Sequence, residues 1–248
     1  MLERVLSNLP ADVVAQIEAY PPTAYLLDPA EKTDIPYVYI NPQQPLKIDP
    51  KLPGIVVAAG PSGVGKDTVI EKAKSEEGIY FVVSATNRQR RIDKGEPEDA
   101  YVWMRAQRSG ESWKSYVENL VGEYRLLEHD VHHGNVYGMP EVSLNEAIRQ
   151  GIALVRVDLN GAETISSLYQ GKANVMVVFI VPDNFEQIWD RIRGRDNALT
   201  RMRDSVGDVI KAPNVAHFYL HNGYDARGYS TQVHDSFVNL IKQKLKIF

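Results

Sequence analysis

One segment, Gly60–Thr68, constrains this chain more than any other feature of its sequence. It reads Gly-Pro-Ser-Gly-Val-Gly-Lys-Asp-Thr, follows the apolar run Ile55–Ala59 and precedes a helical pattern over 67–74. Glycines at this spacing let backbone N–H groups approach phosphate oxygens, and the lysine and the helix N-terminus add positive charge. The segment therefore predicts a buried strand, a phosphate-binding loop (P-loop) and a helix, as at the start of a nucleotide-binding α/β domain.

The residues of this loop have two predicted roles. Lys66 supplies a mobile positive charge for the β- and γ-phosphates of a nucleoside triphosphate. The next position normally carries a hydroxyl that holds Mg²⁺, but here it is an aspartate, so we expect either Asp67 or Thr68 to hold the metal. The predicted nucleotide-binding residues of the loop are Gly60, Ser62, Gly63, Val64, Gly65, Lys66, Asp67 and Thr68.

Strand-like and helix-like segments alternate along the rest of the chain. Apolar, β-rich runs occupy 80–83, 152–157 and 175–181, and helical patterns occupy 140–150, 161–169, 184–194, 200–211 and 230–246. This alternation predicts an α/β fold of three αβα layers around a mainly parallel sheet. Residues 84–140 break the alternation and are expected to form an insertion.

The first part of the chain differs in composition from the rest. Residues 1–52 are rich in proline, with a helical pattern over 2–20 that Pro10 interrupts and a strand-like run at 37–40. We expect these residues to form an N-terminal extension that packs on the main domain, residues 53–248.

Composition narrows the class of function. Lys and Arg number 28 against 32 Asp and Glu, for a formal charge of −4, so a dedicated nucleic-acid binder is not expected. Cysteine is absent, which excludes disulfides and thiol catalysis. No apolar run approaches the roughly 18 residues of a membrane span, and no secretory signal pattern is present. We therefore expect a cytoplasmic protein that acts on small molecules and has no membrane partner. The oligomeric state is left open.

Polar motifs follow the loop in a definite order. The chain has Ser-Ala-Thr-Asn-Arg-Gln-Arg-Arg at 84–91, Glu-His at 128–129, Gly-Asn-Val-Tyr-Gly at 134–138 and Asp-Leu-Asn-Gly at 158–161. From about residue 54 to the C-terminus, the chain resembles the guanylate kinase family. This resemblance implies a kinase that uses ATP and Mg²⁺ to phosphorylate a nucleoside monophosphate, GMP before others. It also implies a core of 53–83 and 141–248, a nucleoside-monophosphate (NMP)-binding insertion at 84–140 and a short lid at about 194–203.

The resemblance also implies roles for individual residues. The acceptor nucleotide would be held by Ser84, Arg88, Arg91, Glu128, Tyr137 and Asp158. A carboxylate such as Glu128 accepts two parallel N–H bonds, which suits the edge of guanine. Asn222 would lie near the adenine of ATP. The implied catalytic residues are Lys66, Arg195, Arg201 and Asp158, with the two arginines arriving on the lid.

Several positions depart from the family's pattern and leave the acceptor open. Met139 replaces a hydroxyl residue that contacts the base, Ala100 replaces a tyrosine, and Lys94 falls where the family has a glutamate. Met139 and the Gly-Lys-Asp loop are similar to the family's ribose 1,5-bisphosphate kinase relatives, so a phosphorylated sugar is the alternative acceptor. A guanylate-kinase-like binding module without catalysis is the second alternative, and the intact P-loop argues against it.

Overall fold

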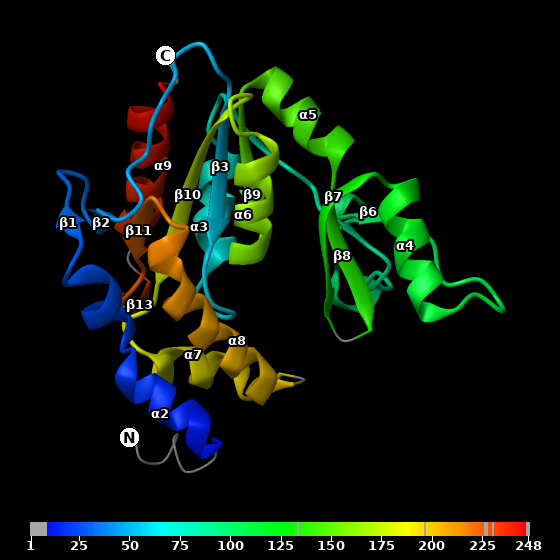
Figure 1. Ribbon diagram of the computed structural model, residues 1–248, viewed down its shortest axis with the longest axis horizontal. Coiled ribbons are helices and arrows are strands. Elements are labelled where there is room, and N and C mark those ends of the chain that lie inside the picture. Colours follow the sequence, from blue (N-terminus) through cyan, green and yellow to red (C-terminus); the bar gives the residue numbers. More distant parts are fainter. Residues whose placement is uncertain (1–8, 133, 196, 226–227, 230, 247–248) are drawn as a thin grey trace.

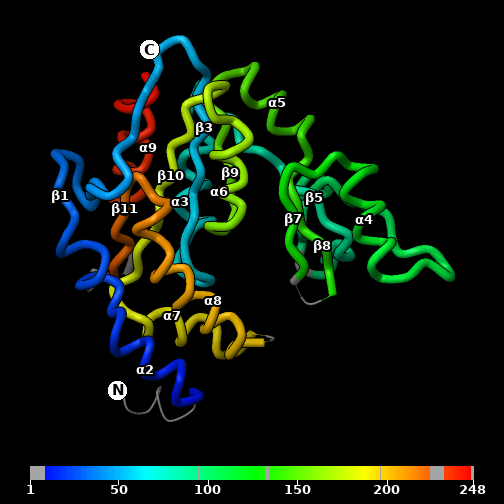
Figure 2. Tube along the Cα trace, in the orientation of Figure 1, coloured from blue at the N-terminus to red at the C-terminus, as the bar shows by residue number. Residues whose placement is uncertain are grey.

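The protein is described by a computed structural model that covers residues 9–132, 134–195, 197–225, 228–229 and 231–246. Figure 1 shows a layered core built around one sheet and a smaller lobe that projects from one side of it. The tube in Figure 2 shows that the chain enters and leaves this smaller lobe at the same edge of the core.

The core sheet has seven strands in the order β1-β2-β11-β10-β3-β9-β4. Their bounds are β1 Glu31–Lys32, β2 Val38–Ile40, β3 Gly54–Ala59, β4 Ile79–Phe81, β9 Ile152–Arg156, β10 Asn174–Val181 and β11 Phe218–His221. The five strands from β11 to β4 run parallel, whereas β1 and β2 are antiparallel additions at one edge. Every residue of β3 is buried, as its unbroken apolar run predicts for a strand covered on both faces.

Helices cover both faces of the sheet. They are α3 Lys66–Lys74, α5 Glu141–Gln150, α6 Leu159–Leu168, α7 Phe185–Ile192, α8 Ala198–Lys211 and α9 Thr231–Leu245. β3 leads through α3 to β4 in one direction along the sheet, whereas β9 leads through α6 to β10 in the other. Right-handed crossovers in opposite directions place α3 and α6 on opposite faces (Figure 1). The predicted three-layer αβα fold is therefore confirmed.

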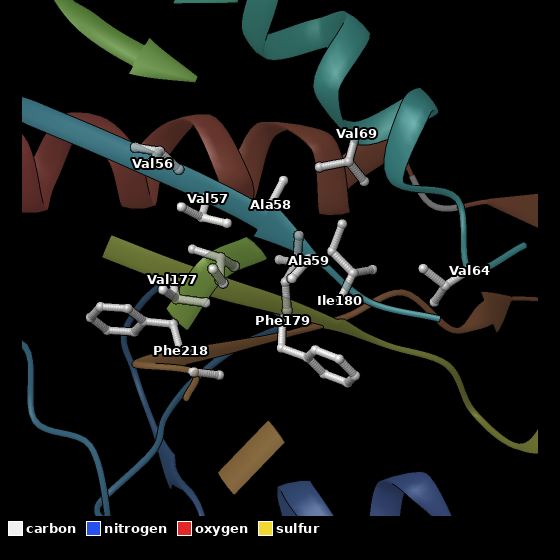
Figure 3. Close-up of a cluster of buried hydrophobic side chains, with 14 of the residues drawn as sticks. Val56, Val57, Ala58, Ala59, Val64, Val69, Val177, Phe179, Ile180 and Phe218 are labelled. Atoms are coloured by element: carbon white, nitrogen blue, oxygen red, sulfur yellow. The ribbon is translucent and has the colours of Figure 1, made fainter. Parts of the chain in front are cut away.

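The core is continuous from the sheet into the P-loop. Figure 3 shows apolar side chains of β3 and β10 packed together, with Val69 of α3 beside them and Val64 of the loop at the end of the cluster. Val64 and Val69 are both fully buried. Each Å² of buried apolar surface stabilises the fold by about 25 cal/mol. Because apolar side chains are buried on both sides of the loop, the phosphate-binding backbone is part of the rigid core.

The smaller lobe is formed within residues 84–140 and has its own sheet, in the order β6-β5-β8-β7. Its elements are β5 Ala85–Thr86, β6 Val102–Trp103, α4 Trp113–Glu123, β7 Leu126–His132 and β8 Asn135–Pro140, with 3₁₀ turns at Ile92–Lys94 and Glu98–Ala100. Tyr116 and Leu120 of α4 pack with Val136 of β8 in a small apolar core separate from the main one. Because the smaller lobe has an apolar core of its own, it is a packing unit distinct from the main core.

The N-terminal residues are integrated into the core. Pro10 begins helix α2, Ala11–Ala19, and a π-helical segment, Thr23–Leu27, follows it. The amide of Asn41 donates to the carbonyls of Pro213 and Ala216, so the segment after β2 is tied to the turn that follows α8. Residues 1–8, the first part of the predicted helix over 2–20, lie outside the described residues.

The sequence analysis did not predict the two-residue edge strand β1 or strand β11, Phe218–His221. The four residues of β11 are too few to show a clear period, and they follow a short turn, Ala212–Asn214, that comes directly after α8. Within the described part of the chain, no helix is long and apolar enough to cross a membrane.

Candidate active site

The P-loop connects β3 to α3 through glycines in backbone conformations that other residues rarely adopt. Gly60 has φ of 147°, and Gly65, which precedes the first residue of α3, has φ of 99°. A Cβ at Gly60 would lie 2.8 Å from the carbonyl oxygen of Ile180. Glycine is therefore required where the loop crosses β10, and this fixes the loop at the carboxyl end of the sheet, where ligands bind in such folds.

The ammonium group of Lys66 is held over the loop. Its Nζ donates to the carbonyls of Gly60 and Pro61, at 2.6 and 2.9 Å. Burial lowers the pKa of the Lys66 amine below its ordinary value, and the carboxylates of Asp208 and Asp67 oppose that shift. The lysine is thus a positioned cation beside the loop's N–H groups, as an anion site requires.

Three side chains from later parts of the chain reach the loop. Arg191 of α7 donates to the carbonyl of Gly63 at 2.6 Å, and Arg201 of α8 lies 3.3 Å from the Ser62 hydroxyl. Asn222, fully buried after β11, donates from Nδ2 to the carbonyl of Val64 at 2.7 Å. The structure therefore brings the predicted residues Arg201 and Asn222 to the P-loop.

The other predicted lid arginine is placed differently. Arg195 is solvent-exposed in the short connection between α7 and α8, and its backbone N–H donates to Ile192. Arg191, which sequence analysis did not assign to the site, contacts the loop as Arg201 does. The lid residue Asp196 lies outside the described residues.

Asp158 marks the end of the neighbouring strand. It follows β9 as the N-cap of α6, and its Oδ1 accepts the backbone N–H of Gly161 at 2.7 Å. Asp208 of α8 also lies in this region, and its pKa is raised to about 7 by burial, with Lys66 opposing the shift. Sequence analysis missed Asp208, because an aspartate in an amphipathic helix has the pattern of a solvated face.

In the smaller lobe, the arginine motif already binds a carboxylate. Both Nη atoms of Arg88 donate to Glu96, at 2.5 and 3.1 Å, and the backbone N–H of Arg91 donates to the same carboxylate at 2.8 Å. These bonds lower the pKa of Glu96 to about 2. The geometry shows that the two Nη atoms of Arg88 can each donate a hydrogen bond to a different oxygen of one planar anion. The Arg91 side chain is exposed.

Aromatic rings line the space beside this arginine. The Cζ atom of Arg88 lies 5.4 Å from the ring centre of Tyr101, and the Tyr101 and Tyr137 rings are 6.3 Å apart, edge to face. Ser84 is half-buried at the start of this motif, and its carbonyl accepts the N–H of Val102. The predicted acceptor residues Ser84, Arg88 and Tyr137 thus belong to one sheet, β6-β5-β8-β7, or to the segments that flank its strands.

Glu128 of β7 connects the smaller lobe to the core. A Cβ built on Gly161 would lie 3.3 Å from its Oε2, so the carboxyl group lies against the start of α6. Burial raises the pKa of Glu128 to about 7, and the negative charges of Asp158 and Asp130 add to the shift. A half-buried carboxyl group whose pKa is displaced by burial and by neighbouring charges is typical of functional sites.

Asp67 is the predicted metal ligand whose surroundings the sequence did not anticipate. Its Oδ1 accepts from Nη1 of Arg156 at 2.5 Å, while the neighbouring Thr68 is exposed. Arg156 also reaches Tyr101 of the smaller lobe, and sequence analysis missed it because it ends an otherwise apolar strand. The assignment of the metal to Asp67 or Thr68 stays a prediction.

The comparisons with known proteins agree with this geometry. The sequence model of the guanylate kinase family matches residues 53–218. The chain belongs to the guanylate kinase family. Guanylate kinase 2, chloroplastic/mitochondrial, of Oryza sativa subsp. japonica is 29% identical, over 79% of this chain and 67% of its own. A guanylate kinase of Prochlorococcus marinus subsp. pastoris is 30% identical, over 68% of this chain and 88% of its own.

The fold is also that of a solved family structure. The crystal structure of guanylate kinase from Anaplasma phagocytophilum superimposes with a TM-score of 0.55, at 22% sequence identity, over 82% of this chain and 89% of that one. This likeness supports the guanylate kinase fold for the core and the smaller lobe together.

Asn222 gives a stability prediction for the P-loop. We expect Asn222→Asp to destabilise the protein by about 2–3 kcal/mol, because a carboxylate cannot donate to the Val64 carbonyl and leaves it unsatisfied. Thermal unfolding measures the effect, with Asn214→Asp, at an exposed site, as the matched control. An unfolding temperature equal to that of the control would show that the Asn222 bond does not hold the loop.

Proposed function

We propose that this protein transfers the γ-phosphoryl group of ATP to GMP, forming ADP and GDP. One observation carries the proposal: a short series of side-chain contacts links a P-loop with a positioned lysine to an arginine that binds a carboxylate with both nitrogens. Asp67, next to the P-loop lysine, contacts Arg156, and Arg156 contacts Tyr101, over whose ring Arg88 lies. Two anion sites separated by so few side chains suit the transfer of a phosphoryl group between two phosphates.

On the donor side, the loop N–H groups and Lys66 would hold the β- and γ-phosphates. Arg201, already at the Ser62 hydroxyl, is placed to neutralise charge on the group in transit, and Arg195 would join it when the lid closes. On the acceptor side, Arg88 would exchange the Glu96 carboxylate for the phosphate of GMP. No general base is needed, because a phosphate oxygen is already a nucleophile.

Mg²⁺ is the metal that we propose for the donor site. The exposed Asp67 carboxylate and Thr68 hydroxyl are oxygen donors beside the P-loop lysine, and oxygen is the ligand type that Mg²⁺ prefers. The donor set therefore fits the metal, with Asp67 shared between it and Arg156. When bound, Mg²⁺ would neutralise charge on the phosphates.

Glu128 favours a guanine base over a sugar phosphate as the acceptor. Its carboxylate lies against the start of α6 and would accept two N–H bonds from the guanine edge. A phosphorylated sugar has hydroxyl groups but no such pair of adjacent N–H donors. The intact loop and Lys66 likewise argue against a binding module without catalysis.

The acceptor assay that tests this proposal measures ADP release from ATP with GMP, AMP, dTMP, UMP and ribose 1,5-bisphosphate in parallel. We expect GMP to have the highest kcat/KM. A higher value for ribose 1,5-bisphosphate would assign the protein to the sugar phosphate alternative. Binding of ATP without turnover of any acceptor would contradict the proposal and support a binding module.

The raised pKa of Glu128 predicts how GMP binding depends on pH. Only the ionised carboxylate can accept both guanine N–H bonds, and the pKa of about 7 means that it is increasingly protonated as the pH falls. The ionised fraction of a group with this pKa falls about fivefold between pH 7 and pH 6, so we expect KM for GMP to rise about fivefold over this range, while KM for ATP changes less. The phosphate of GMP also titrates in this range, so the matched control is Glu128→Gln. Equal pH profiles for the two proteins would contradict the assigned role of Glu128.

A further inference from the structure

Arg156 is a charged residue at the centre of the site that the functions assigned above do not use. It is the last residue of β9 and pairs in register with Ala58, close to the point where β3 runs into the P-loop. The carboxyl ends of two neighbouring parallel strands therefore place Arg156 beside the loop. The four residues before it in β9 are buried, so its backbone is fixed by the core.

Three groups from different parts of the chain hold its guanidinium. Nη1 donates to Asp67 in the first turn of α3, at 2.5 Å, and Nη2 lies 3.3 Å from the hydroxyl of Tyr101 in the smaller lobe. The ring of Phe81, at the end of β4, lies 6.0 Å from its Cζ atom. Arg156 thus lies between the donor loop and the lobe that carries the acceptor site.

The contacts of Arg156 lead through Tyr101 to Arg88, the arginine of the acceptor site. The Tyr101 ring that receives Arg156 at its hydroxyl has Arg88 over its face, 5.4 Å from the ring centre. Arg156 also acts on the other side, because its charge is among those that lower the pKa of Lys66. The charge of Arg156 therefore acts on Lys66 of the donor loop, and the Tyr101 ring lies between Arg156 and Arg88 of the acceptor site.

The pairing with Asp67 leaves Arg156 able to bind an anion. The Asp67 side chain is 74% exposed and that of Arg156 is 28% exposed, so water already competes for the carboxylate. Because the carboxylate is solvated, this ion pair is weaker than one in which both partners are buried. A phosphate that offers more charge and a second acceptor oxygen can therefore share or replace Asp67 at the guanidinium.

We infer that Arg156 binds the phosphoryl group in transit, as a catalytic residue supplied by the core sheet in addition to the arginines of the lid. The inference rests on the proposed function. In the step it serves, an oxygen of the acceptor phosphate forms a bond to the γ-phosphorus. The bond from that phosphorus to the bridging oxygen breaks, and its electron pair stays on ADP. The guanidinium neutralises charge on the equatorial oxygens between the two.

The competing role for Arg156 is a structural latch that holds the smaller lobe to the core through Tyr101. A latch depends on the Tyr101 hydroxyl, whereas a phosphate contact depends on the charge and fork of the guanidinium. Tyr101→Phe, Arg156→Met and Arg156→Lys separate the two roles. Arg149→Met, an exposed arginine on α5, is the matched control.

The experiment measures, by calorimetry in Mg²⁺ buffer, the affinity of each variant for ATP alone, for GMP alone and for GMP with ADP and aluminium fluoride. Aluminium fluoride replaces the phosphoryl group in transit. We expect Arg156→Met to weaken binding of the aluminium fluoride complex about 100-fold, and Arg156→Lys to weaken it about tenfold. The affinities for ATP alone and for GMP alone should each change less than about threefold. Tyr101→Phe and Arg149→Met should stay close to the wild type.

Two results would overturn the inference. In the first, Tyr101→Phe loses as much affinity for the aluminium fluoride complex as Arg156→Met does, which would assign Arg156 the role of the latch. In the second, both Arg156 variants bind the aluminium fluoride complex with the affinity of the wild type. Wild-type protein that fails to turn over GMP would instead contradict the proposed function. The comparison would then be made with the acceptor that the protein does phosphorylate, and if it phosphorylates none, both proposals fail.

Discussion

Replacing Lys66 with alanine is expected to lower kcat for ATP and GMP by about 10²–10³-fold, the range seen when one preorganised group that stabilises transition-state charge is removed. Its Nζ is fixed by two loop carbonyls and cannot be replaced by water without loss of that preorganisation. The side chain contributes no apolar contact that the core depends on, so the fold should persist. Steady-state kinetics with a circular dichroism spectrum measures both effects.

The matched control for this variant is Lys72→Ala. Lys72 lies on the same helix, α3, but is nearly half exposed and pairs with Glu76 and Asp235. Its removal should change kcat less than about twofold, because exposed ion pairs of this kind are worth at most about 1 kcal/mol. Near-normal turnover by folded Lys66→Ala would mean that phosphoryl transfer does not occur at this loop.

Arg88→Met is expected to raise KM for GMP about 100-fold, with KM for ATP nearly unchanged. The guanidinium of Arg88 holds Glu96 through both Nη atoms, and the same fork would bind the acceptor phosphate. Methionine keeps the apolar stem of the side chain but loses both charge-assisted bonds, which are worth about 1.5–3 kcal/mol each. Kinetics with each substrate varied in turn distinguishes the acceptor effect from a donor effect.

Arg90→Met is the control for the acceptor arginine. Arg90 has the same charge in the same segment, but it is exposed and donates from Nε to the backbone carbonyl of Glu96. We expect its effect on KM for GMP to be less than about threefold, because its carbonyl contact lies outside the Arg88 fork. Equal effects of the two substitutions would show that the motif acts through its total charge rather than through the fork of Arg88.

The parts of this protein that sequence predicted are those that local patterns determine. The glycines and lysine of 60–66, between an apolar strand and a helix, predicted the loop, and the glycine conformations there are a direct consequence of its turn geometry. Helix α5, Glu141–Gln150, follows its predicted range of 140–150 to within a residue because its apolar spacing is strong. The αβα layering followed from the order of strands and helices alone.

The parts that sequence did not predict depend on which distant side chains meet. Arg156 and Asp67 are 89 positions apart, and no local pattern links them. Asp208 has the spacing of an exposed helical residue, yet α8 turns it toward Lys66. Glu96, to which the sequence analysis assigned no role, is the carboxylate that the arginine motif binds. Such pairings follow from packing and topology, which composition and periodicity do not contain.

The most direct test of the account follows the phosphorus atom itself. Single-turnover reactions with ATP labelled in the γ-phosphate and with GMP would be stopped over time, and the label would be located in the products. The account predicts that the label appears in the β-phosphate of GDP at the rate at which ADP forms. Label released as inorganic phosphate, with no labelled GDP, would contradict the claim that two facing anion sites pass one phosphoryl group between them.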